Sequence, residues 1–350
     1  MNQTTEPEPE LTDRQRRILR GVVEGYVATG QPVGSRTLVE LTGLDVSSST
    51  VRSELAELET RGLLTHPHTS AGRIPTERGY RYYADRLLER LEPQPEGFPL
   101  GLNSAKTEVD AALQATSEAL SELTRLLALV SAPPLGTATV RHVEVLLLQP
   151  QLAMVVVITS TGSVTKRVYR FSEPVDPGLA SWAAEYLNDR VSGLELGSRL
   201  LLRRLDDPSL GATERAFLQP IESLFREALA AEGQSLYVGG TAGLLEGLRA
   251  EELDVYQRLL EVLEKRAALL EVVSHALDPR RPFVRVGPEL EHPSMRELSL
   301  VGASYGLTDR TLGAVSLLGP VRMDYDKALR SVRAAAHELS RFLEEIYEDN

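Results

Sequence analysis

The sequence predicts an α+β protein of several domains, in which an all-helical head precedes a body of mixed strands and helices. Short helical patterns dominate the first ninety residues. A cluster of Pro and Gly over 93–101 then separates this head from the rest of the chain. Beyond the cluster, strand-like runs enclose and alternate with helical ones, which is typical of an α+β body. With 350 residues, the chain is long enough for two or three hydrophobic cores.

The composition excludes several classes of protein. The chain has no cysteine, which removes disulfides, thiolate catalysis, Fe–S clusters and Cys-based zinc sites. The acidic, polar N-terminus does not resemble a signal peptide. The purest apolar run, 153–158, is far shorter than the ~18 residues that a membrane span needs. We therefore expect a cytoplasmic protein without a membrane partner.

Charge is distributed unevenly along the chain. The net charge is −12, which argues against a protein that coats nucleic acid over its whole surface. Residues 11–90 nevertheless carry a net charge of +2, whereas residues 91–350 carry −11. This asymmetry fits a nucleic-acid module joined to an acidic body, although chance is the alternative.

The first two helices of the head have recognisable ends. Residues 1–10 read as a disordered tail. Thr12 and Gln15 fit a capping box, and apolar residues follow at helical spacing. We expect Ser35 to cap a short second helix that Gly43 ends.

A third helix and a hairpin complete the head. Ser47 or Ser48 is expected to cap the third helix, and Gly62 to end it in a left-handed conformation. Residues 63–76 are rich in turn-forming residues and predict a β-hairpin, whereas residues 77–91 predict another helix. Three helices followed by a hairpin form the pattern of a winged helix-turn-helix.

The body, which follows a linker at 93–104, is expected to contain seven groups of elements. In order, these are a helix near 105–130; strands at 142–149, 153–160 and 163–171 in an antiparallel meander; helical residues over 176–232 with breaks at Gly193, Pro208, Gly211 and Pro220; a strand at 236–239; a helix at 250–275; strands near 283–287, 298–304 and 312–318; and a terminal helix at 326–348.

The third helix carries the clearest functional pattern. Val51, Leu55 and Leu58 share one face and must point to the core. The opposite face is small or flexible, so it can enter a major groove, where Arg52 can pair with guanine. The residues of that face are Ser48, Ser49, Arg52 and Ser53. A three-helix module with a protein-binding surface is the alternative.

Other polar residues of the head can contact DNA outside the major groove. The start of the second helix, with Ser35, Arg36 and Thr37, can bind backbone phosphate. The hairpin adds His68, Thr69, Ser70 and Arg73, and the arginine can reach a minor groove. The acids Glu54, Glu57 and Glu59 of the third helix oppose phosphate. They must point away from the DNA or pair with Arg52 and Arg61.

The chain resembles the bacterial heat-inducible transcription repressor (HrcA) family. The resemblance in the head rests on GQPVGSRTL (30–38), TVRSELAELE (50–59), PHTSAGRIPT (67–76) and GYRYY (79–83). In the body it rests on LYVGGTAGLL (236–245), SLVGASYG (299–306), LGAVSLLGP (312–320) and VRMDY (321–325). It runs from about Leu11 to the C-terminus and is loose over 90–105 and 172–235.

The resemblance implies a fold and a function. The fold would be a winged-helix DNA-binding domain over 11–92, a GAF-like domain of 105–172 and 236–350, and an inserted dimerising domain over 173–235. The protein would bind an inverted-repeat operator (the CIRCE element) of chaperone operons as a homodimer. Heat would release it, and a GroEL-type chaperonin would promote the DNA-binding form.

One departure from the family concerns base reading. The family usually has Arg-Asn where this chain has Arg52 and Ser53. Asn can make a bidentate contact with adenine and Ser cannot, so base reading at position 53 is in doubt.

The body offers weaker candidates. Arg322, Asp324 and Tyr325 lie where the last strand meets the terminal helix, and they suggest a dimer contact or a pocket. Asp324 or Asp326 can instead cap the helix, and we favour Asp326. The Gly-rich turn at 239–243 can cradle a phosphate, but a tight loop is the simpler interpretation.

An enzyme is not expected, because the six histidines are scattered and no catalytic or metal-binding motif is present. We expect neither a cofactor nor a metal. The main alternative to a heat-shock repressor is a ligand-sensing GAF-domain regulator of other genes. A protein-interaction scaffold is a third possibility.

Overall fold

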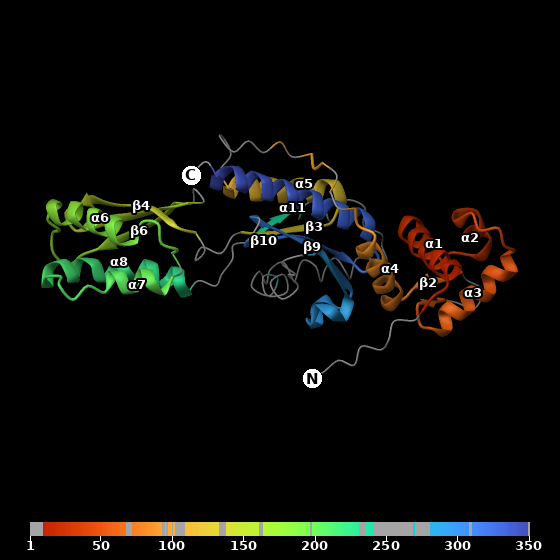
Figure 1. Cartoon of the computed structure of the whole chain (residues 1–350). Helices are drawn as coiled ribbons and strands as arrows, with labels where there is room; N and C mark the ends of the chain where they lie inside the picture. The colour runs from red at the N-terminus through yellow and green to blue at the C-terminus, as the bar shows by residue number, and fades with distance from the viewer. Residues whose placement is uncertain are drawn as a thin grey trace.

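The computed structural model describes residues 10–67, 72–92, 95, 97–99, 101, 109–132, 138–160, 164–196, 198–230, 236–240, 269, 281–307 and 310–348. Helices and strands are mixed over this range, as the sequence predicts for an α+β protein. A helical head, a five-stranded sheet and a three-stranded sheet with its own helices follow one another along the molecule (Figure 1). No helix among these residues combines the length and the apolar character needed to cross a bilayer.

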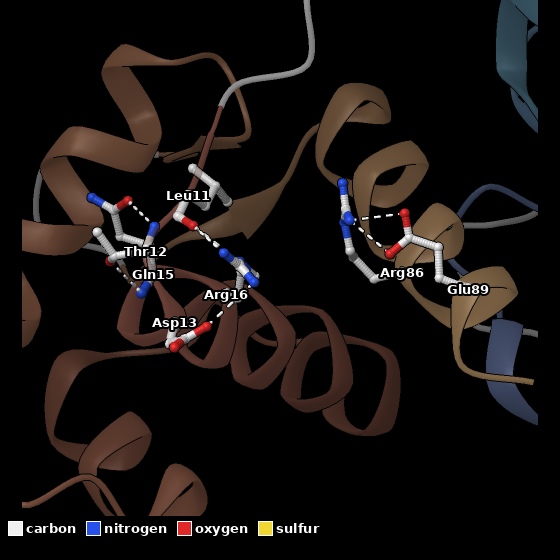
Figure 2. A network of polar contacts seen from close by, with 7 residues as sticks. All are labelled: Leu11, Thr12, Asp13, Gln15, Arg16, Arg86 and Glu89. Atoms are coloured by element: carbon white, nitrogen blue, oxygen red, sulfur yellow. Dashed lines mark hydrogen bonds and ion pairs between the residues drawn. The ribbon is translucent and has the colours of Figure 1, made fainter.

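The head contains four helices and a short hairpin. These are α1 (Asp13–Thr29), α2 (Ser35–Thr42), α3 (Ser48–Thr60), β1 (Leu64–Thr65), β2 (Ile74–Pro75) and α4 (Glu77–Glu89). The predicted capping box is confirmed, because the Thr12 and Gln15 side chains each accept a hydrogen bond from the other's backbone N–H. Figure 2 shows both contacts at the start of α1.

The ends of α2 and α3 are sharp. The expected cap at Ser35 is wrong, because Gly34 is the N-cap and Ser35 is already the first helical residue. Ser47 caps α3 by accepting from the Thr50 N–H. The predicted end at Gly62 is confirmed: its φ is +73°, and the next N–H, of Leu63, donates to Leu58 at 3.0 Å.

The hairpin is fastened to the segment between α1 and α2. β1 and β2 pair antiparallel, with Leu64 opposite Pro75. The backbone N–H groups of Val33 and Arg73 each donate to the other residue's carbonyl at 2.9 Å. The segment around Val33 therefore pairs with the hairpin as a short third strand would. This contact demands glycine next to it, since a Cβ on Gly72 would lie 2.5 Å from the Val33 carbonyl carbon.

The central sheet has five antiparallel strands in the order β7-β3-β10-β9-β8. Their bounds are β3 (Leu127–Ser131), β7 (Leu236–Gly239), β8 (Phe283–Val286), β9 (Leu298–Leu307) and β10 (Arg310–Pro320). Helices α5 (Val109–Thr124) and α11 (Tyr325–Glu348) pack against the sheet. Two short 3₁₀ turns, η4 (Gly287–Leu290) and η5 (Pro293–Met295), connect β8 to β9.

The expected helix near 105–130 is too long. α5 ends at Thr124, Arg125 takes a left-handed φ of +59°, and β3 begins at Leu127. All five residues of β3 are buried because the strand lies inside the sheet. A short, uniformly apolar segment has no alternation, so its periodicity did not distinguish it from the end of a helix.

β7 lies very close to α5. A Cβ on Gly239 would be 2.1 Å from the Ser117 carbonyl oxygen, and Gly240 has a φ of +90°. This is what the tight-loop interpretation of the glycines requires. Residues 241–243 of that turn, and the helix expected at 250–275 apart from residue 269, lie outside the described residues.

The third region is built from three strands and three helices. The predicted meander is confirmed in β4 (Val140–Gln149), β5 (Leu152–Thr159) and β6 (Val164–Arg170). The helices are α6 (Pro177–Val191), α7 (Arg199–Leu205) and α8 (Ala212–Ala230). The break expected at Pro220 is wrong, because Pro220 lies inside α8. Phe217, Ile221 and Phe225 are buried on both sides of it, and this packing offsets the cost of the proline.

This region has its own core. The inner face of the β4–β6 sheet packs with α6, α7 and α8, and the cluster includes Val143, Val155 and Phe225. Residues 140–157 of the strands and 180–225 of the helices thus share one core. Most of the apolar residues between 194 and 225 are buried in this core, although Leu200 remains 50% exposed.

The head and the central sheet share one continuous hydrophobic cluster. The Tyr80 ring of α4 lies 5.8 Å from the Tyr325 ring of α11. Arg81, also on α4, donates to the Val284 carbonyl at 2.5 Å and pairs with Glu289 at 3.3 Å. Helix α4 therefore fixes the head to the body through both apolar and polar contacts.

Candidate nucleic-acid interface

Helix α3 divides into a buried face and an exposed face. Val51, Leu55 and Leu58 are buried, as the spacing predicts. On the opposite side, Ser49, Arg52 and Ser53 are exposed, together with Ala56, and Ser48 is half-buried. The exposed face has no bulky side chain other than the arginine.

Two of the arginines singled out in the sequence are available to a partner. Arg52 on α3 and Arg36 on α2 are exposed. Within the part of the chain that the structure describes, neither has an ion-pair partner. Most other arginines of the head are held by carboxylates or carbonyls, so these two are the cations best placed to bind an anionic polymer.

The carboxylates of α3 are neutralised within the head. Arg14 pairs with Glu54 at 2.9 Å, and Arg61 pairs with Glu57 at 2.5 Å. The hydrogen bond from Arg61 lowers the pKa of Glu57 below its usual range. If these acids did not point away from the DNA, Arg52 and Arg61 were the partners expected from the sequence. Arg61 does pair with Glu57, whereas among the described residues Arg52 has no carboxylate partner.

Arg73 pairs with the third carboxylate, Glu59, at 2.8 Å. His66 contacts the same carboxylate through Nδ1. Arg73, which is 21% exposed, thus ties the hairpin to α3 in this structure. His68, Thr69 and Ser70, also expected to contact DNA, lie outside the described residues.

The sequence did not reveal that Arg14 pairs with Glu54 or that Arg73 pairs with Glu59. These pairs join α1 and the hairpin to α3 across long stretches of sequence, and no local spacing signals them. The surface is therefore shaped by tertiary contacts, although the helix that presents it was recognised.

The first turn of α2 lies beside α3 in the head. Arg36 and Thr37 are exposed there, and Ser35 is half-buried. The Gly34 N-cap makes no side-chain hydrogen bond, so the first N–H groups of α2 have no cap from that residue. At the other end, Arg17 donates to the Thr42 carbonyl at 2.8 Å and holds α2 against α1.

The three body candidates, in contrast, make contacts within the chain itself. Arg322 stacks over the Tyr26 ring of α1 at 4.8 Å, and so links the body to the head. Tyr325 is 1% exposed, and its hydroxyl lies 2.8 Å from the Ser299 hydroxyl. This burial leaves Tyr325 no surface for a second chain.

The favoured cap at Asp326 is wrong. Asp324 precedes the first residue of α11 and accepts from the Lys327 N–H at 3.0 Å. Asp326 lies in the first turn and pairs instead with Arg330 at 2.7 Å. The helix thus starts one residue earlier than predicted.

An exposed helix with one free arginine, on a head fixed to a larger α+β body, is typical of a DNA-binding regulator. The family model described as HrcA protein C terminal domain matches residues 110–329. The chain is 33% identical over 341 residues to the heat-inducible transcription repressor HrcA of Pelotomaculum thermopropionicum, covering 96% of this chain and 98% of that one. The corresponding repressor of Nocardia farcinica is 35% identical over 337 residues, covering 95% and 97%.

The chain therefore belongs to the heat-inducible transcription repressor HrcA family, whose members are transcription repressors rather than enzymes. A solved crystal structure of a hypothetical protein at 2.2 Å resolution shares the fold with a TM-score of 0.61 and 23% identity. That likeness covers 96% of this chain and 98% of the other.

Proposed function

We propose that this chain represses chaperone operons by binding an inverted-repeat operator of the CIRCE type as a homodimer, and that heat releases it. The observation that carries the proposal is the exposed face of α3, where Arg52 stands free beside Ser49 and Ser53. An unpaired guanidinium on a slender helix face suits guanine O6 and N7 in a major groove.

A winged-helix head is supported by the way the hairpin is held. The β1–β2 pair follows α3 and is bonded to Val33, which precedes α2. Such a hairpin stands beside the recognition helix and can contact the adjacent DNA backbone or minor groove. We assign this head to residues 11–92.

Two further domains are assigned on sheet pairing. We propose a GAF-like domain from 105–132 and 236–350, centred on the five-stranded sheet. We propose an inserted domain over about 138–230, because β4–β6 pack on α6–α8 and not on the central sheet. We propose that it starts earlier than residue 173, the boundary that the family resemblance implies.

The outer face of the β4–β6 sheet is our candidate for the dimer interface. It carries several partly exposed apolar side chains among charged ones, since the helices pack on the inner face. Leu146 is 41% exposed, Val164 51% and Val168 53%. Met154 and Val156 of the central strand lie between them in the register. An apolar face of this kind favours association.

Charges on the same face favour a second copy as the occupant. Glu144 on β4 and Lys166 on β6 both pair with Val156 of β5, on opposite sides of it. A two-fold axis along β5 brings Glu144 of each copy over Lys166 of the other. Glu144 also contacts His142 of its own strand at 3.0 Å, so the Glu144–Lys166 pair supplies one self-complementary contact of the kind an isologous dimer uses.

The dimer explains the form of the operator. Two α3 helices related by a two-fold axis read two half-sites in inverted orientation, and their separation fixes the half-site spacing. Heat needs only to shift the population of the DNA-binding form, and each ~1.4 kcal/mol of shift lowers that form tenfold. A GroEL-type chaperonin that restores the binding form would close a feedback loop.

The first test is Arg52→Ala. We expect the operator affinity to fall by about 1–3 kcal/mol, with relaxed sequence preference, because the variant loses a base contact. Competition binding with operator duplexes carrying single base changes measures both effects.

Arg36→Ala provides the contrast. Arg36 is equally exposed, but we assign it to a phosphate, so its loss should weaken operator and scrambled duplexes alike. The slope of log affinity against log salt should decrease in magnitude by about one. If both variants lose the same operator affinity and keep their sequence preference, the residues that read the bases lie outside α3.

A further inference from the structure

A groove of the head lies away from α3, between α1, α4 and the start of α11. Its volume is about 710 Å³, within the range of small-molecule sites. Five arginines line it: Arg16, Arg17 and Arg20 from α1, and Arg86 and Arg90 from α4. Leu19, Tyr82, Tyr83 and Leu87 supply apolar surface.

Arginines of α1 and of the C-terminal end of α4 line this groove together. The Tyr83 hydroxyl of α4 contacts Glu24 of α1 at 3.3 Å. Figure 2 shows Arg16 and Arg86 on facing helices.

The carboxylates of the groove do not neutralise all five cations. Arg16 pairs with Asp13 at 3.2 Å, and Arg86 pairs with Glu89 at 2.6 Å. Arg20 faces Glu24 at 3.7 Å. Partial burial raises the pKa of Glu24 above its usual range, although 55% of its side chain remains exposed.

Two arginines remain without a carboxylate. Arg17 donates to the Thr42 carbonyl and keeps its positive charge uncompensated. Arg90 is exposed, and among the described residues it has no ion-pair partner. The third acid of the lining, Asp326, is engaged by Arg330. The groove therefore carries an excess of two positive charges.

We infer that this groove binds a small organic phosphate carrying at least two negative charges. The charge excess matches a dianion, and guanidinium groups are the strongest protein donors to phosphate oxygens. Leu19, Leu87 and the tyrosines provide an apolar wall for the organic part of such a ligand. The inference does not depend on operator binding, since the groove lies apart from the exposed face of α3.

The test is isothermal titration of the full chain with inorganic pyrophosphate and, separately, with ATP at constant ionic strength. We expect saturable binding of one ligand per chain. ATP should bind more tightly than pyrophosphate, because its organic part can contact the apolar wall. The double variant Arg17→Gln/Arg90→Gln should raise Kd about tenfold or more. Arg203→Gln, on the exposed surface of α7, is the matched control and should leave Kd unchanged.

Several results would overturn the inference. One is no saturable binding of either probe to a chain whose circular dichroism and melting temperature are normal. Another is equal binding by the double variant and the control. A third is that the chain binds neither pyrophosphate nor ATP, while operator binding by the double variant depends less on salt. That result would make the groove a contact for the DNA backbone.

Discussion

Gly72→Ala is expected to cost the protein much of its operator affinity without unfolding its body. The new Cβ would lie 2.5 Å from the Val33 carbonyl carbon, 2.6 Å from its oxygen and 2.8 Å from the Pro32 carbonyl carbon. All three atoms belong to the backbone, so no side chain can rotate away. The hairpin must move, and the paired hydrogen bonds between Val33 and Arg73 are lost.

Overpacking of this kind typically costs about 1–3 kcal/mol. If the docked hairpin is needed to bind DNA, the affinity falls by about 5- to 150-fold. Operator titration measures the loss, and thermal unfolding reports on the rest of the chain. Gly97→Ala is the control, because a Cβ there meets nothing within 4 Å. Unchanged affinity in the Gly72 variant would show that the attachment of the hairpin to Val33 is dispensable for binding.

Val168→Asp is expected to convert the dimer into monomers. Val168 is 53% exposed on the outer face of the β4–β6 sheet, so the substitution should change the stability of an isolated chain by only a few tenths of a kcal/mol. In the proposed interface the aspartate faces Leu146 of the other copy, twice per dimer, and its nearest cations are Lys166 and Arg170 of its own strand. A total cost of at least about 4 kcal/mol follows, or roughly a thousandfold in the dimer dissociation constant.

Sedimentation velocity over a range of concentrations measures this change directly. Leu200→Asp is the matched control, since Leu200 is 50% exposed on α7 and lies off the sheet face. The Val168 variant should also lose selectivity for the inverted repeat over a single half-site. If Val168→Asp remains dimeric while Leu200→Asp dissociates, the dimer forms through the helices of this domain instead.

The sequence was most informative where structure is local. Thr12, Ser47 and Gly62 define helix ends through bonds to residues a few positions away, and the first and last of these ends were predicted correctly. The buried face of α3 followed from helical spacing in the same way. The meander of β4–β6 was also recognised, because turn residues separate its strands.

The spacing of residues in the sequence did not predict how distant segments pack together. β3 was read as the end of a helix, since a fully buried strand has no alternation. Pro220 was expected to break α8, whereas burial of its neighbours keeps the helix continuous. The ion pairs of α3 with Arg14 and Arg73 bridge distant segments, so sequence spacing did not predict them.

The central claim is that α3 reads an inverted repeat and that heat ends the binding. Fluorescence anisotropy of the purified protein with an inverted-repeat duplex and a scrambled duplex, at fixed salt, tests it most directly. The measurement is made at growth temperature and after a heat step, with and without chaperonin. We predict tight binding to the inverted repeat alone, lost on heating and restored by chaperonin. Equal affinity for both duplexes under every condition, unaltered by Arg52→Ala, would contradict the account.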